Sequence, residues 1–189
     1  GLVLGAAPDA SGSAVDLQQC VVGLVVTNDV SARDIQVPQG QWFKGKSFRT
    51  FCPVGPYLVL LDHDDYGRLG DLQLTLRVNG EVRQQGHVSD MIYRPAETLA
   101  ELAGIMDFKA GELLLSGSPA GVAMQVPAGL RAMFLQFIRS PKDHMRNFVE
   151  TQAASGRYLR DGDVIHASIA TVDGELDLGM QELTVTAPA

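Results

Sequence analysis

Apolar residues alternate with polar ones in several stretches of the chain, which is the pattern of half-buried β-strands. The clearest examples are Leu72 to Val78 and Asp163 to Ile169. Val21 to Val26 is apolar on both faces, which predicts a central strand. Shorter strands are predicted at Leu2–Leu4, Tyr57–Leu61, Glu81–Gln85, Leu113–Leu115 and Glu182–Thr186.

Helical spacing of apolar residues occurs in fewer segments. Pro95 to Met106 starts with a proline, which suits the first position of a helix, and carries an apolar stripe of Leu99, Leu102, Ala103 and Met106. Leu130–Ile138 and Pro141–Ala154 have the pattern of a helical pair. Asn79-Gly80 and Asp173-Gly174 predict hairpin turns. Many strands with two or three helices predict an α+β fold with a mixed sheet.

A polar stretch, Thr27 to Thr50, separates two apolar runs and concentrates the candidate chemistry. It holds acids, arginines, lysines, glutamines and the only tryptophan of the chain. Val30 to Gln36 predicts a helical turn, whereas Pro38, Gly40 and Gly45 predict a loop for the remainder. Polar residues presented between two buried strands are typical of a functional site.

The bulk composition narrows the classes of function. The 189 residues suit a single domain, residues 1–189, and the net charge of −7 disfavours a nucleic-acid surface. No apolar run approaches the ~20 residues that span a bilayer, so we expect no membrane segment. Two cysteines make no disulfide framework and predict a reducing, cytoplasmic setting. The chain starts at Gly1 inside an apolar segment, which indicates a fragment of a longer protein.

Four residues of the polar stretch are candidates for binding a cation and an acidic substrate. Asp29 follows the predicted central strand and offers carboxylate oxygens to a divalent cation, or else caps the following turn. Arg33 and Gln36 fall on one helical face. The guanidinium of Arg33 fits a substrate carboxylate, or else forms an ion pair with Asp29 or Asp34. Lys46, between two small residues, touches a ligand oxygen or is a solvated loop lysine.

Ser118 lies in a second loop of small residues. It does not fit a nucleophile elbow, because Ser116 stands where that motif has glycine and Pro119 has no N–H for an oxyanion hole. We therefore expect Ser118 to offer its hydroxyl to a substrate and not to act as a nucleophile.

Five short motifs occur in a fixed order along the chain. They are Asn28–Gln36, Gly45–Phe48 with Cys52–Pro56, Val78–Glu81, Ser89–Ile92 and Ser116–Val122. Any one of them alone is unspecific. In their order and approximate spacing, they resemble the fumarylacetoacetate hydrolase family from about Val21 to the end of the chain.

The resemblance implies a β-rich fold of packed, rolled sheets with a few peripheral helices, a homodimer, and Mg²⁺, Mn²⁺ or Ca²⁺ as cofactor. It implies hydrolysis of C–C bonds in acylpyruvates and related 1,3-dioxo acids. By position, Asp29 resembles the metal-binding aspartate, and Arg33 and Gln36 resemble substrate contacts. Lys46 resembles the lysine beside the metal and the enolate, so Lys46 and Arg33 are the expected catalytic residues. Ser118 stands where the family usually has threonine, which keeps the hydroxyl for substrate binding.

Two features depart from the family pattern. The family's Glu-x-Glu metal motif would fall just before Gly1, and its lid with a histidine and a glutamate lies further upstream. Asp29 alone would be a poor Mg²⁺ site, so we expect weak cation binding by this chain. Residues 126–155 are a predicted helical insertion, longer than the short connection common in the family.

Three functions stay open from the sequence. The first is a metal-dependent hydrolase that cleaves C–C bonds in a small oxo-acid. The second is an isomerase, tautomerase or decarboxylase that uses the same site on a related 2-oxo acid. The third is a non-catalytic remnant domain with a structural or partner-binding role.

Overall fold

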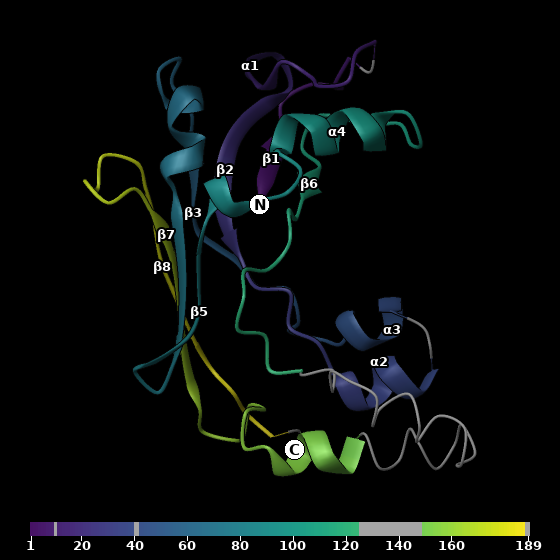
Figure 1. The fold of residues 1–189 in the computed structure, drawn as a ribbon, viewed down its shortest axis with the longest axis vertical. Helices are drawn as coiled ribbons and strands as arrows, with labels where there is room; N and C mark the ends of the chain where they lie inside the picture. The colour runs from purple at the N-terminus through teal and green to yellow at the C-terminus, as the bar shows by residue number, and fades with distance from the viewer. Residues whose placement is uncertain (10, 40–41, 125–148, 188–189) are drawn as a thin grey trace. The chain divides into compact units, whose positions relative to one another are not determined.

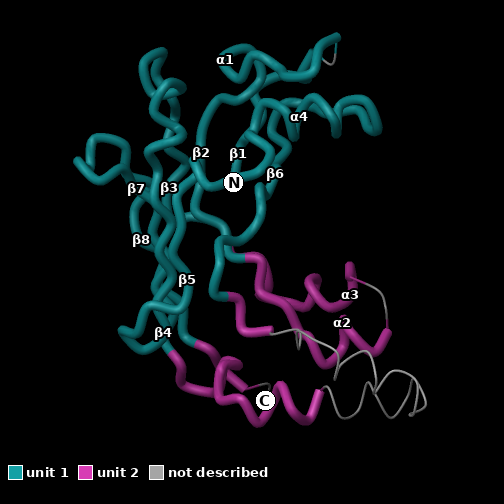
Figure 2. The backbone as a smooth tube through the Cα atoms, viewed as in Figure 1, with its two compact units in different colours: residues 1–28, 54–121, 164–184 teal, residues 29–53, 122–163, 185–189 magenta. Residues whose placement is uncertain are grey.

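The computed structural model describes residues 1–9, 11–39, 42–124 and 149–187. The chain divides into two compact units, which Figure 2 colours separately. The first unit holds Gly1–Asn28, Val54–Gly121 and Val164–Thr184. The second unit holds Asp29–Pro53, Val122–Asp163 and Val185–Ala189. The single domain expected over residues 1–189 stays a prediction.

One antiparallel sheet of the first unit has the strand order β3-β2-β1-β6 (Figure 1). Its strands are β1 (Leu2–Leu4), β2 (Val21–Thr27), β3 (Val54–Leu60) and β6 (Leu113–Leu114). Leu24 of β2 lies opposite Leu2 on one side and Val59 on the other. The apolar sequence of β2 thus belongs to an interior strand, as predicted.

The other antiparallel sheet of the first unit has the order β5-β4-β7-β8. Its strands are β4 (Gln73–Val78), β5 (Glu81–His87), β7 (Val164–Ala170) and β8 (Asp177–Thr184). Asn79 and Gly80 join β4 to β5 with φ angles of 51° and 83°, the positive values that a type I′ turn requires. In β7 the buried residues are every second one, Ile165, Ala167 and Ile169, which confirms the alternating pattern.

The second predicted hairpin turn is longer than the sequence suggested. Thr171 and Leu176 close it by a backbone hydrogen bond of 2.8 Å, and of the Asp173-Gly174 pair only Gly174 has a positive φ angle. Inside the loop, Asp173 accepts hydrogen bonds from the Thr171 hydroxyl at 2.6 Å and from the Glu175 N–H at 3.1 Å. The Asp173-Gly174 pair thus lies in a hairpin loop between β7 and β8, as predicted, and this loop is longer than two residues.

Helical segments surround the core of the first unit. They are α1 (Leu17–Cys20), α4 (Pro95–Ala103) and the 3₁₀ turns η1 (Asp65–Asp71) and η2 (Val88–Asp90). Residues of both sheets and of α4 contribute to one hydrophobic core, and Leu99 of α4 is 0% exposed. The helix ends earlier than predicted, because the chain turns at Gly104. Met106 therefore lies beyond α4 and is 51% exposed instead of buried.

The second unit contains α2 (Arg33–Gln39), α3 (Trp42–Lys46) and a helical stretch at residues 149–154. The loop predicted from Pro38 and Gly45 is therefore wrong on both sides of residues 40–41. Pro38 sits near the end of a short helix, where it removes one hydrogen bond only. Most of the predicted insertion at 126–155, including Leu130–Ile138, lies outside the described residues.

Two antiparallel sheets with a few helices confirm the α+β class, although the described strands form no mixed sheet. Membrane crossing would need a long apolar helix, and none occurs in the part of the chain that the structure describes.

Candidate functional site

Asp29 and Lys46 form an ion pair in the second unit. Asp29 comes soon after β2 along the chain, and Lys46 is the last residue of α3. Nζ of Lys46 donates to Oδ2 of Asp29, and the side chains of Lys46 and Asp29 are 25% and 34% exposed. Because α2 begins at Arg33, Asp29 does not cap it. Lys46 is a paired helix residue and not a solvated loop lysine.

Gly45 allows α2 and α3 to pack closely enough to hold this pair. A Cβ atom at Gly45 would lie 2.5 Å from Cβ and 3.0 Å from Cα of Gln36. Side chains do not make such contacts, so only glycine fits where the helices meet. The N–H of Ala32 also donates to the carbonyl of Gly45 at 2.8 Å. Gly45, which the sequence suggested was a loop residue, is therefore a packing residue. Its contacts fix the position of the backbone next to Lys46.

Arg33 and Gln36 pair with each other along α2. Nη1 of Arg33 donates to Oε1 of Gln36. Gln36 is 3% exposed, and its Nε2 makes no hydrogen bond with any residue that the structure describes. A buried N–H without a partner costs about 1–3 kcal/mol, so a ligand oxygen or a water molecule would stabilise it. The structure thus pairs Arg33 with Gln36 and not with Asp29, whose partner is Lys46.

Tyr158 belongs to the same unit and was not anticipated from the sequence. Burial raises the pKa of its hydroxyl, while the charge of Arg33 lowers that pKa and the charge of Asp34 raises it. Both charges therefore act on the ring of Tyr158. The hydroxyl donates to Oε1 of Gln152 at 3.3 Å, and Gln152 is 9% exposed. No motif marks Tyr158, because it is distant from Arg33 along the chain.

Ser118 belongs to the first unit, where it is exposed in a loop that lies against β5. A Cβ atom at Gly121 would lie 2.1 Å from the carbonyl oxygen of Arg83, and one at Gly86 would lie 2.8 Å from Cβ of Pro119. These close contacts hold the loop along the strand. Asp29, Lys46, Arg33 and Gln36 belong to the second unit, so the substrate contact of Ser118 stays a prediction.

Asp29 fits one position of a hard-cation site. Its carboxylate oxygen is the ligand type that Mg²⁺, Mn²⁺ and Ca²⁺ prefer. The ammonium of Lys46 already stands where a cation would approach Oδ2. In the described ranges, no three histidine, cysteine, aspartate or glutamate side chains are grouped to hold a metal. The described residues therefore supply one ligand, and the weak cation binding expected from the sequence stays a prediction.

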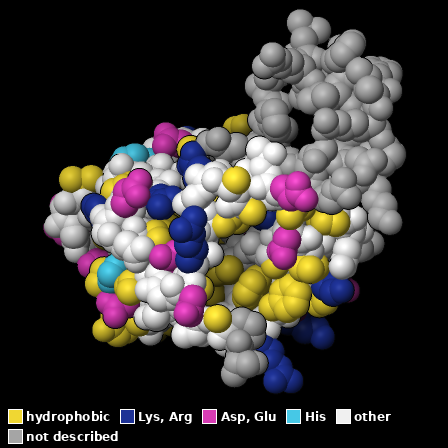
Figure 3. Space-filling view, turned by 90° about the horizontal axis from the view of Figure 1, so that it is seen from below, with side chains coloured by type: hydrophobic (Ala, Val, Ile, Leu, Met, Phe, Trp, Pro, Cys, Tyr) yellow, Lys and Arg dark blue, Asp and Glu magenta, His cyan; other side chains and the backbone are white. Residues whose placement is uncertain are grey.

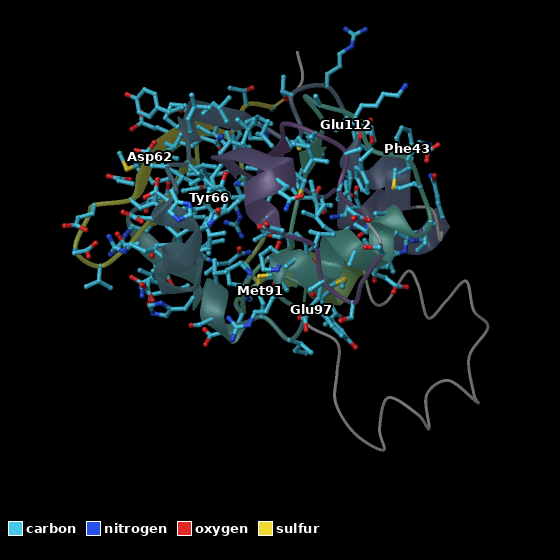
Figure 4. All side chains as sticks on the ribbon, turned by 90° about the horizontal axis from the view of Figure 1, so that it is seen from above. Phe43, Asp62, Tyr66, Met91, Glu97 and Glu112 are labelled. Atoms are coloured by element: carbon cyan, nitrogen blue, oxygen red, sulfur yellow. The ribbon has the colours of Figure 1, made fainter. Side chains whose placement is uncertain are left out.

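Aromatic and basic residues meet the solvent on α3. Trp42 is 68% exposed and Phe43, labelled in Figure 4, is 81% exposed. Lys44, which follows Phe43 along the helix, is also exposed. Figure 3 shows acidic, basic and hydrophobic side chains together on one face of the molecule. The helix that carries Lys46 is therefore locally cationic in a chain whose net charge is −7.

Curated relatives match little more than half of the chain. A mitochondrial oxaloacetate tautomerase of Rattus norvegicus, Fahd2a, is 39% identical over 112 residues, which are 59% of this chain and 35% of that protein. Oxaloacetate tautomerase YisK of Bacillus subtilis is 40% identical over 107 residues, which are 57% of this chain and 35% of that protein. The matched region is thus about a third of each relative's length.

Solved structures share the fold over nearly the whole chain. A probable 2-hydroxyhepta-2,4-diene-1,7-dioate isomerase from Mycobacterium abscessus is 29% identical with a TM-score of 0.73, covering 100% of this chain and 58% of that one. A fumarylacetoacetate hydrolase from Exiguobacterium antarcticum is 30% identical with a TM-score of 0.69, and the match covers 99% of this chain and 54% of that one. The family model described as fumarylacetoacetate hydrolase C-terminal matches residues 1–186. The resemblance read from the five motifs is confirmed, and the chain belongs to the fumarylacetoacetate hydrolase family.

Proposed function

We propose that this chain is the catalytic part of a divalent-cation-dependent enzyme that interconverts the keto and enol forms of a small 2-oxo acid. The observation that carries the proposal is the grouping of Asp29, Lys46, Arg33 and Gln36 on α2, α3 and the segment before them. Two relatives near 40% identity are oxaloacetate tautomerases, which favours tautomerisation over the hydrolysis expected from the sequence.

Each of the four residues has a chemical role in this proposal. The guanidinium of Arg33 binds a substrate carboxylate through its planar fork. Nε2 of Gln36, which has no partner among the described residues, donates to a second substrate oxygen. The ammonium of Lys46 stabilises the negative charge that develops on the enolate oxygen. A cation held by Asp29 would polarise the keto group.

Tautomerisation moves one proton between the carbon next to the keto group and the keto oxygen. The enolate is the high-energy species on this path, so groups that stabilise it lower the barrier. Cleavage of a C–C bond in an acylpyruvate would release the same kind of enolate. Hydrolysis is therefore kept as the second candidate, supported by the hydrolase from Exiguobacterium antarcticum at 30% identity.

The test is turnover of oxaloacetate by the purified chain with Mg²⁺ or Mn²⁺. Loss of the ultraviolet absorbance of the enol should be faster than with the same cation alone. Lys46→Met and Asp29→Asn should abolish the acceleration, whereas Lys44→Met, which removes the same charge from the same helix, should keep it. A chain that binds the cation to saturation and still gives no acceleration would instead favour the non-catalytic alternative.

Product analysis separates the remaining reactions. With acylpyruvates, release of a second carboxylic acid would mean hydrolysis, and release of CO₂ from oxaloacetate would mean decarboxylation. The homodimer and the cytoplasmic location stay predictions from the sequence.

A further inference from the structure

We propose that the exposed strand β3 is the surface through which two copies of this chain form a two-fold symmetric dimer. The family resemblance implies a homodimer but assigns no surface to it. All residues of the proposed interface belong to the first unit, and the dimer does not depend on the proposed function. We call this surface the β3 patch, and its members are Val54, Tyr57, Leu58 and Leu60 of β3 and Met180 of β8.

Large apolar side chains of β3 meet the solvent along the whole strand. The four members of the β3 patch on this strand are 51–64% exposed, and β3 contains no charged residue. It is also the outermost strand of its sheet among the described strands. Edge strands that stay in water usually carry charged residues, lysine above all, which prevent association. The composition of β3 therefore suits contact with a protein surface and not with water.

Leu58 and Leu60 point away from the core of the first unit. They lie opposite Val25 and Gly23 of β2, whereas Val59 between them packs against the hydrophobic core. Because side chains alternate along a strand, the two leucines share the outer face of the sheet. A Cβ atom at Gly23 would lie 2.9 Å from Cδ1 of Leu58. The missing side chain at Gly23 thus lets Leu58 lie across the outer face.

The β8 strand extends the β3 patch, because β8 runs beside β3 (Figure 1). Gly179 of β8 has a φ angle of 78°, and a Cβ atom there would lie 2.7 Å from Cδ2 of Tyr57. The ring of Tyr57 therefore rests on the backbone of β8. Met180, the next residue of β8, is 56% exposed. The apolar surface is thus continuous from β3 to β8.

The outer face of the other sheet shows what this unit presents to water. Arg77, His166 and Glu182 stand side by side across β4, β7 and β8. Nε2 of His166 lies 2.9 Å from Oε2 of Glu182. Polar and charged side chains thus occupy solvent-facing positions there, whereas β3 carries leucines at such positions. Covering the leucines is favoured by the hydrophobic effect, and this difference between the two sheets marks β3 as the docking surface.

Size and charge favour a second copy as the occupant. The β3 patch exposes on the order of 500 Å² in each copy, which is more than half of the ~800 Å² that each partner buries in a stable interface. A two-fold axis lays this patch on itself, so apolar side chains meet apolar side chains. Copies with a net charge of −7 repel one another, and they approach at least cost through a strand without charges.

Analytical ultracentrifugation of the whole chain over a range of concentrations tests the dimer. The wild type should have twice the mass of one chain, which is 20.3 kDa. The double variant Leu58→Lys, Leu60→Lys should raise the dimer dissociation constant about a hundredfold or more, because it would bury unpaired charges in the interface. The matched control Ile105→Lys, Val172→Lys adds the same charge at residues that are 73% and 86% exposed outside the patch. It should stay within about threefold of the wild type.

Circular dichroism reports whether each variant is folded. If the lysine variant unfolds, the double variant Leu58→Thr, Leu60→Thr decides, because threonine keeps the preference for a strand and should still weaken the dimer about tenfold. A monomeric wild type would overturn the proposal and leave a different protein as the occupant. Wild-type affinity in a folded Leu58, Leu60 variant would overturn it, as would an equal loss in the control. Oligomers that grow beyond two copies would also overturn it, since a two-fold interface closes at the dimer.

Discussion

Replacing Gly45 with alanine is expected to force α2 and α3 apart. The added Cβ would lie 2.5 Å from Cβ of Gln36, 3.0 Å from its Cα and 3.2 Å from the carbonyl oxygen of Ala32. These atoms are part of the backbone or directly attached to it, so no change of rotamer relieves the contact. One helix must move, and the hydrogen bond of 2.8 Å from Ala32 to Gly45 must lengthen with it.

Opposing effects set the magnitude of this change. Inside a helix, alanine is more stable than glycine by about 1 kcal/mol. Overpacking costs about 1–3 kcal/mol, and loss of a hydrogen bond costs about 0.5–1.5 kcal/mol. We therefore expect Gly45→Ala to lower the free energy of unfolding of the second unit by about 1–3 kcal/mol. The steric clash outweighs the higher helix propensity of alanine, because the nearest atoms belong to the backbone or are attached to it and cannot move away by a change of rotamer.

Urea denaturation followed by tryptophan fluorescence measures the effect. Trp42 is the only tryptophan of the chain and lies on the same helix as Gly45, so its signal reports the second unit. Gly104→Ala is the matched control, followed by circular dichroism. Gly104 has a φ angle of −74°, and an added Cβ would meet its nearest neighbour at 3.4 Å. We expect the control to stay within about 0.5 kcal/mol of the wild type.

A Gly45→Ala variant as stable as the wild type, with unchanged Trp42 fluorescence, would refute the close packing of α2 on α3. A double variant gives an independent check. Gln36→Gly removes the nearest contacting atom, so Gly45→Ala should cost less in that background. Additive losses would show that the two positions do not touch.

The other two predictions concern the first unit. The pKa of Asp173 is lowered from 3.8 to about 2 by hydrogen bonds from Thr171, the Glu175 N–H and Arg68. The negative charge of Asp173 therefore stabilises the fold fully above pH ~4, and this stabilisation is lost as the pH falls through 2. Asp173→Asn should therefore lower the melting temperature at pH 7, and the gap to the wild type should close near pH 2; a gap that persists there would contradict this. Leu99→Ala should lower the free energy of unfolding, measured by urea denaturation, by about 2–5 kcal/mol, because Leu99 is 0% exposed. Ile105 is 73% exposed, so Ile105→Ala should leave the free energy of unfolding almost unchanged. Similar losses in the two variants would contradict the burial of Leu99.

Local sequence patterns predicted most of the first unit. The strand β4, the alternating burial in β7, the apolar run of the interior strand β2 and the Asn79-Gly80 turn are confirmed. These features succeed because burial of one strand face and a positive φ angle are decided by neighbouring residues. Predictions failed at the ends of elements. The α4 helix stops at Ala103, before Met106.

The candidate site was predicted residue by residue, but not in its contacts. Asp29, Arg33, Gln36 and Lys46 were named from residue type and motif order. Their pairing was not, because Lys46 reaches Asp29 only if the intervening residues fold into two packed helices. Tyr158 was missed for the same reason, since its nearness to Arg33 depends on contacts between segments distant along the chain.

The sequence by itself determined the strands, the class of fold, the family and the chemical types of the site residues. Each of these depends on residue order, spacing or local conformation. Only the tertiary structure decided that Gly45 is a packing residue, that Gln36 buries an N–H without a partner among the described residues, and that Lys46 pairs with the carboxylate of Asp29. Such facts depend on which atoms approach in space, and the periodicity of side chains along one element does not contain that information.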